Sequence, residues 1–121
     1  MKYIRKQSAQ LFSKMRFHAA QFIPYFEHQL GYKNGEHANK MAQILRNEIA
    51  NVAPFEFTQA TEANIILVKF PEKLIPELQK EHFFYVWNEE THEVRFVTSW
   101  DTTAQDIEML VASLKKCYQQ L

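Results

Sequence analysis

Glycine and cysteine are scarce in this chain, with 2 glycines and 1 cysteine among 121 residues. So few glycines argue against a fold rich in tight turns or in phosphate-cradling loops. The single Cys117 excludes an internal disulfide and suits a reducing compartment. No apolar run is long enough to span a bilayer, and no signal-peptide stretch follows the first residues. We therefore expect a cytoplasmic protein with no membrane partner.

Motifs of the common enzyme classes are missing as well. The chain has no nucleophile elbow, no CxxC or HExxH pattern and no glycine-rich phosphate loop. Glu89 and Glu90 read as a turn dipeptide and not as a catalytic pair of carboxylates. The histidines are scattered without metal-ligand spacing: His18, His28, His37, His82 and His92. The chain alone is therefore not expected to be a complete enzyme, and we predict neither a catalytic residue nor a metal site.

Aromatic residues, in contrast, are plentiful, with ten Phe, five Tyr and two Trp. In a chain of single-domain length, this is more apolar surface than the core is expected to cover, which indicates a partner surface. The net charge is zero, but residues 1–33 carry six of the 14 basic residues and one of the 14 acidic ones. Such a segment suits nucleic acid, a phosphate group or an acidic partner, or is simply a solvated helix face.

Helical periodicity dominates the first half of the chain. Apolar residues such as Leu11, Phe12 and Phe22 recur at helical spacing from about residue 4 to residue 30, which predicts one long helix. Pro24 should kink or divide this helix. Residues 31–35, with both glycines, predict a turn. A second helix is predicted over 36–50, with an apolar stripe of Ala38, Met41, Ala42, Leu45, Ile49 and Val52.

Strand patterns dominate the second half. Residues 55–57 read as a short strand or an extended connection. From residue 64 on, the predicted elements are strands 64–70, 82–87 and 93–99 and helices 71–80 and 103–118. We predict an α+β fold, in the order ααβαββα, with a small antiparallel sheet of about three strands covered by helices. Residues 1–33 would form a long basic and aromatic helix, and residues 34–121 a small α+β domain.

The strand over 93–99 contains the residue that most needs a partner. Two faces alternate along it, Val94, Phe96 and Thr98 on one and Arg95, Val97 and Ser99 on the other. A charge among such apolar neighbours is costly to cover unless an anion meets it. Arg95 can offer a carboxylate a planar, bidentate fork. The alternative is a structural ion pair with an acid such as Glu56 or Glu62.

Three blocks of residues, taken together, resemble a known family. The first is Arg5-Lys6 with residues 13–21 (SKMRFHAAQ), and the second is residues 36–42 (EHANKMA). The third comprises residues 62–71 (EANIILVKFP), 84–88 (FYVWN) and 94–103 (VRFVTSWDTT). They resemble the carboxy-terminal, small domain of low-specificity threonine aldolases, which are pyridoxal-phosphate enzymes of the aspartate-aminotransferase fold type.

The resemblance implies a function for a larger parent protein. Such a parent cleaves β-hydroxy-α-amino acids to glycine and an aldehyde with pyridoxal phosphate as cofactor. By position, Arg95 matches the arginine that binds the carboxylate of the amino-acid substrate. Lys6, with Arg5 beside it, matches a basic position near the cofactor phosphate.

The resemblance also implies what is missing. The large amino-terminal domain and its Schiff-base lysine have no counterpart here, so this chain would be a fragment that is inactive alone. The first helix would then face the missing domain, and we expect a homo-oligomer because members of this family commonly form dimers or tetramers.

Two other interpretations remain open at this point. The chain could be the small domain of another pyridoxal-phosphate-dependent, β-eliminating lyase, because substrate choice lies largely in the missing domain. It could also be a free-standing α+β binding module whose basic first helix contacts nucleic acid or an acidic protein. Phe84, Tyr85 and Trp87 lack the glycine and basic neighbours of an RNA-binding strand motif, so no nucleic-acid partner is expected.

Overall fold

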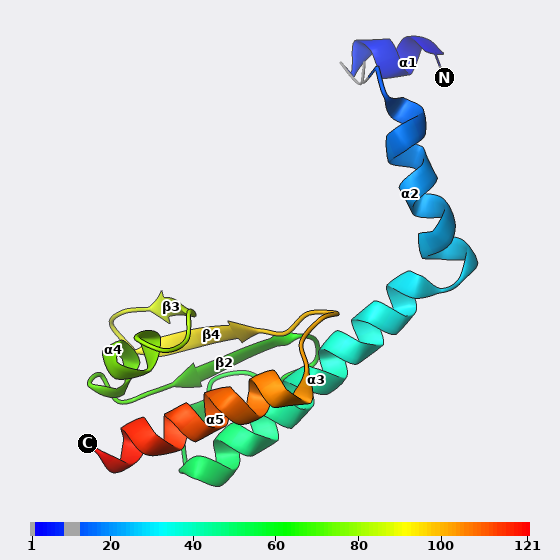
Figure 1. Cartoon of the computed structure of the whole chain (residues 1–121). Coiled ribbons are helices and arrows are strands. Elements are labelled where there is room, and N and C mark those ends of the chain that lie inside the picture. Colours follow the sequence, from blue (N-terminus) through cyan, green and yellow to red (C-terminus); the bar gives the residue numbers. More distant parts are fainter. Residues whose placement is uncertain (1, 9–12) are drawn as a thin grey trace. The chain divides into compact units, whose positions relative to one another are not determined.

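The chain divides into two compact units, Met1–Lys33 and Asn34–Leu121. Figure 1 shows the computed structural model, which describes residues 2–8 and 13–121. Among the sequence predictions, the apolar positions Leu11 and Phe12 lie outside the described residues, and so does the side chain of Arg5.

The first unit is helical but not one helix. Helix α1 runs from Lys2 to Gln7 and helix α2 from Met15 to Glu27, so the prediction of one helix over 4–30 is wrong. Pro24 lies inside α2, which continues to Glu27, so this proline does not divide the helix. Helix α3 then runs from Leu30 to Val52.

The predicted turn at residues 31–35 is also wrong, because α3 includes both glycines. Neither glycine has a positive φ; the left-handed residue between the helices is Gln29, with φ 53°. Gly31 instead permits a close approach, since a β-carbon there would lie 2.4 Å from Cε1 of Tyr25. The glycine thus permits the contact between α2 and α3, and the chain bends just before it, at Gln29.

The second unit contains the sheet. Strands β1 (Glu56–Phe57), β2 (Ile65–Lys69), β3 (Tyr85–Asn88) and β4 (Glu93–Val97) lie in the order β1-β2-β4-β3, with every neighbouring pair antiparallel. Helix α4 (Leu74–Gln79) joins β2 to β3, and helix α5 (Ala104–Gln119) follows β4. The predicted α+β fold is confirmed. The sheet has four strands and not about three, because the segment left open between strand and connection pairs with β2.

One face of the sheet is covered by helices, with α3 and α5 running along it (Figure 1). The alternation predicted for β4 is confirmed, since Val94, Phe96 and Thr98 are buried. The predicted stripe on α3 is buried too, except that Val52 is half-buried. Apart from Ala38 and Thr98, these side chains form one core with other residues of the second unit, including Ile66, Val68, Leu74, Ile75, Leu78, Phe84, Ile107, Val111 and Leu114. Within the second unit, the opposite face of the sheet carries no helix.

Hydrogen bonds fix the corner between β4 and α5. The hydroxyl of Thr98 donates to the carbonyl of Ala38 at 2.7 Å, and the Nε2 of His37 lies 2.8 Å from the carbonyl oxygen of Thr102. Thr103 and Asp106 form a reciprocal capping box at the start of α5. The hydrogen bonds from Thr103 hold the pKa of Asp106 below its ordinary value. The carboxyl end of β4 is thereby tied to α3 and α5.

Candidate functional site

Arg95 lies on the face of the sheet that the helices of the second unit leave uncovered. Its direct cross-strand partners are Leu67 on β2 and Tyr85 on β3. Because side chains alternate along a strand, these three residues form a row across the open face. The half-buried Arg95 therefore has an aliphatic neighbour on one side and an aromatic neighbour on the other.

The guanidinium of Arg95 is held by aromatic rings. Its Cζ lies 4.8 Å from the ring centre of Trp87 and 5.2 Å from that of Tyr85. Both distances are within the range of a cation–π interaction. Sequence reasoning did not assign this role to the two rings, although their positions two residues apart on the neighbouring strand place them on the same face as Arg95.

No acid neutralises Arg95 within the part of the chain that the structure describes. Glu56, one partner considered from the sequence, pairs with Lys69 at 2.7 Å. Glu62, the other, lines the same hollow as Arg95, but no ion pair joins the two in the described residues. The Nε of Arg95 is buried and has no hydrogen-bond partner. A partly buried charge without a partner is unfavourable, so the physical argument for an anionic ligand of Arg95 still holds.

The hollow in front of Arg95 has a volume of about 360 Å³. Its wall is largely apolar, and its lining residues come from β2, β3, β4 and the loop before β2: Gln59, Ala60, Glu62, Ala63, Ile65, Leu67, Trp87 and Arg95. The loop is anchored from α3, where Gln43 donates to the carbonyl of the buried Thr61 and Arg46 contacts the Thr61 hydroxyl at 3.4 Å. One unpaired cation in a small, mostly apolar hollow suits a small organic anion.

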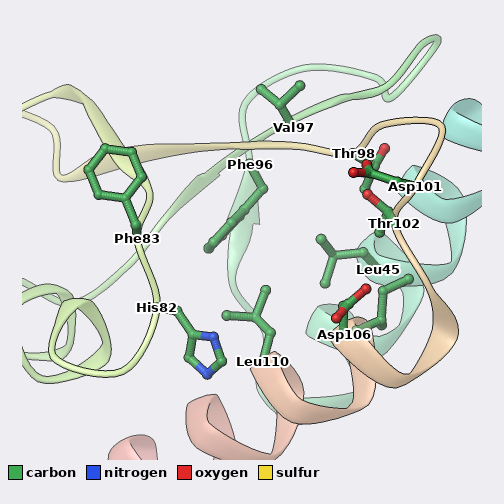
Figure 2. A pocket seen from close by; sticks show the side chains of 11 residues that line it. Leu45, His82, Phe83, Phe96, Val97, Thr98, Asp101, Thr102, Asp106 and Leu110 are labelled. Atoms are coloured by element: carbon green, nitrogen blue, oxygen red, sulfur yellow. The ribbon is translucent and has the colours of Figure 1, made fainter.

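A second hollow, of about 330 Å³, lies between β4 and α5 (Figure 2). Figure 2 shows Asp101, Thr98 and Thr102 gathered at one end and His82 at the other. The polar groups here have local partners: Asp101 accepts from the hydroxyl of Ser99, Asp106 belongs to the capping box, and Thr102 Oγ1 accepts from the Ser99 amide at 2.8 Å. These hydrogen bonds stabilise the corner, and both carboxylates of the hollow are engaged by local donors.

A chain of hydrogen bonds joins α5 to the segment before β3. Ser113 donates its hydroxyl proton to Glu81 at 2.7 Å and lies 2.9 Å from the Nε2 of His82. Since the serine has a single proton to donate, His82 donates to Ser113 through Nε2. Lys116 contacts the other oxygen of Glu81 at 3.1 Å. The hydrogen bonds from Ser113 and Lys116 hold the pKa of Glu81 below its ordinary value of 4.5.

This lowered pKa predicts a pH dependence of stability. The unfolded state keeps a proton on Glu81 up to a higher pH than the folded state does. The hydrogen bonds to the Glu81 carboxylate therefore stabilise the fold fully above pH 4.5, and this stabilisation is lost as the pH falls through the pKa of the folded state. We expect Ser113→Ala to lower the midpoint of urea unfolding at pH 7, and part of that difference to disappear near pH ~3. Glu81→Gln, which cannot titrate, is the control. The same difference at every pH would contradict the assignment.

The remaining predicted site residues lie in the first unit. Lys6 is an exposed residue of α1, and Arg5 belongs to the same helix, although its side chain is not described. Within residues 2–8 and 13–121, no group of three or more His, Cys, Asp or Glu side chains could hold a metal ion. None of the helices in this described part is long and apolar enough to cross a membrane.

Comparison with known proteins supports the family suggested by the sequence blocks. No family model matches the chain. It is 29% identical over 113 residues to the low specificity L-threonine aldolase of a Pseudomonas species, and 31% identical over 114 residues to that of Pseudomonas aeruginosa. Each alignment includes 93% of the chain but only 33% of the relative, so the chain spans about a third of their length.

Comparison of the fold with solved structures also leads to a threonine aldolase. A solved threonine aldolase of Leishmania major superimposes on 66% of the chain with a TM-score of 0.59 and 25% sequence identity, and this match includes 24% of that protein. The two lines of evidence agree with the resemblance to a carboxy-terminal, small domain. In sequence and in fold, the chain is therefore a relative of the low-specificity threonine aldolases that corresponds to about one third of such a protein.

Proposed function

We propose that this chain supplies the substrate-carboxylate site of a threonine-aldolase-like lyase and is not catalytic by itself. The parent protein would cleave a β-hydroxy-α-amino acid to glycine and an aldehyde, with pyridoxal phosphate bound mainly by a separate amino-terminal domain. Arg95 would bind the α-carboxylate of the amino-acid substrate. The similarity to low specificity L-threonine aldolases supports the reaction class.

The observation that carries this proposal is the unpaired guanidinium of Arg95. It lines a hollow of about 360 Å³, and its buried Nε has no hydrogen-bond partner in the described chain. The guanidinium is permanently charged, and its planar fork matches the geometry of a carboxylate. A carboxylate in the hollow would provide the missing negative charge and accept its hydrogen bonds.

Pyridoxal phosphate itself does not fit the residues around Arg95. The cofactor needs a lysine amine for its covalent link and several donors around its phosphate. The described lining of the hollow contains no lysine and only one cation. A role for Lys6 and Arg5 near the cofactor phosphate therefore belongs to the assembled parent, to which these residues would contribute from α1.

The proposal can be tested on the chain as it stands. After incubation with pyridoxal phosphate and removal of the excess, we expect no stable absorbance band of an internal aldimine and no cleavage of threonine. A stable band accompanied by turnover of threonine would show a complete active site and overturn the proposal. The proposed role of Arg95 in binding the substrate carboxylate is tested separately, by measuring the binding of small carboxylates to the chain.

A further inference from the structure

Trp87 lies at an irregularity in the sheet. Strand β3 pairs Val86 with Val94 and Asn88 with Glu93, so two steps along β3 match one step along β4. Trp87 is the extra residue and has no partner opposite it, which is the arrangement of a β-bulge. Bulges re-aim the side chain that they carry, and here the indole lines the hollow beside Arg95.

We propose that Trp87 is a positioning residue for the carboxylate site: its indole holds the guanidinium of Arg95 in the orientation that meets the ligand. This inference rests on the proposed function of Arg95. The ring centre of Trp87 is closer to the guanidinium carbon than that of Tyr85, at 4.8 Å against 5.2 Å. Trp87 also lines the hollow, whereas Tyr85 is not among its lining residues.

The physical reason is the absence of any other fixed partner for the cation. An arginine usually loses side-chain freedom by pairing with an acid, but Arg95 has no such pair within the described residues. Stacking on the indole restricts the guanidinium without neutralising it, so the charge stays available to a carboxylate. An arginine that is already oriented loses less conformational entropy when a ligand binds.

The inference predicts a graded response to substitution. With 56% of its surface exposed, Trp87 can be replaced without emptying the core, so the folded state should survive in Trp87→Leu. We expect Trp87→Leu to weaken acetate binding about threefold to tenfold, which corresponds to loss of one cation–π contact. Trp87→Phe keeps an aromatic face and should restore affinity to within about twofold of the wild-type value.

The measurement is a titration of the full ¹⁵N-labelled chain with sodium acetate, followed by the Nε–H resonance of Arg95 in nuclear magnetic resonance spectra. Sodium chloride at equal ionic strength is the salt control, and Arg95→Lys assigns the resonance by removing it. Trp100→Leu is the matched control, because Trp100 is also an exposed tryptophan but lies outside the hollow. If Trp87→Leu is poorly folded by circular dichroism, Trp87→Met takes its place.

The outcomes separate this inference from the function on which it rests. Weaker binding in Trp87→Leu with recovery in Trp87→Phe supports the positioning role, since loss of mere bulk would not be restored by a ring. Wild-type affinity in Trp87→Leu, with binding lost in Arg95→Leu as followed by backbone amide resonances around the hollow, overturns the role of Trp87 and leaves the carboxylate site intact. An Arg95 resonance that does not respond to acetate in the wild-type chain overturns both.

Discussion

Arg95→Leu is expected to lower the affinity of the chain for a small carboxylate by about tenfold or more. A hydrogen bond to a charged group contributes roughly 1.5–3 kcal/mol, and leucine removes both the charge and its donors. Arg95→Lys should recover only part of the affinity, because an ammonium is a point charge that cannot form a planar, bidentate pair. Titration with acetate or glycine, monitored by backbone amide resonances around the hollow, measures the effect.

The same substitution should leave the fold nearly as stable as before. Leucine loses the stacking on Trp87 and Tyr85 but also removes a buried nitrogen that has no partner. These effects oppose each other, so the free energy of unfolding should change by no more than about 1 kcal/mol. A large loss of stability would indicate a structural arginine and argue against the site.

Lys69→Met provides the control for bulk charge. Lys69 lies on the same open face of the sheet and pairs with Glu56, but it does not line the hollow. If carboxylates were attracted only by the local electrostatic field, both substitutions would weaken binding to a similar extent. We expect Lys69→Met to bind acetate as the wild-type chain does at physiological ionic strength.

Phe96→Ala is expected to cost about 3–5 kcal/mol of unfolding free energy, the usual range for removing a buried phenylalanine. Phe96 is 7% exposed and contacts two other rings, with centroid distances of 5.0 Å to Phe84 and 6.0 Å to Phe70. The truncation would therefore leave a cavity in the centre of the core beneath Arg95. Urea unfolding monitored by circular dichroism measures the loss.

The neighbouring residue supplies a matched comparison. Val97 is 53% exposed and points to the opposite face, so Val97→Ala should change stability by no more than about 0.5 kcal/mol. Phe96→Leu keeps most of the volume and should lose less than half as much as Phe96→Ala. Similar losses for Val97→Ala and Phe96→Ala would mean that β4 is displaced by one residue from its assigned register.

Much of the second unit could be predicted because its local patterns agree with its packing. The period-two alternation of β4 placed Val94 and Phe96 in the core and Arg95 on the other face, as the structure has them. The helical stripe on α3 behaved in the same way. Such patterns arise because one side of a helix or strand is buried, so they can be recognised from the order of apolar and polar residues alone.

The first unit was harder to predict from the sequence, because a glycine can serve either a turn or a close contact between helices. Two glycines within residues 31–35 predicted a turn, but both lie in α3 with ordinary helical backbone. The bend between the helices lies at Gln29, and a glycine is needed at position 31 because the ring of Tyr25 lies against it. A close approach between residues of two helices depends on their packing, which no local pattern reveals.

The sequence by itself determined that the chain is an α+β fold and that Arg95 faces away from the core, and it predicts an anionic partner for this arginine. It also contained the blocks that relate the chain to threonine aldolases. Only the tertiary structure decided that Glu56 is paired with Lys69, that Nε of Arg95 has no partner among the described residues, and that the ring of Trp87, at a bulge, lies 4.8 Å from the guanidinium. The reason is that local periodicity fixes which face a side chain takes, whereas strand register and long-range contacts fix what it meets there.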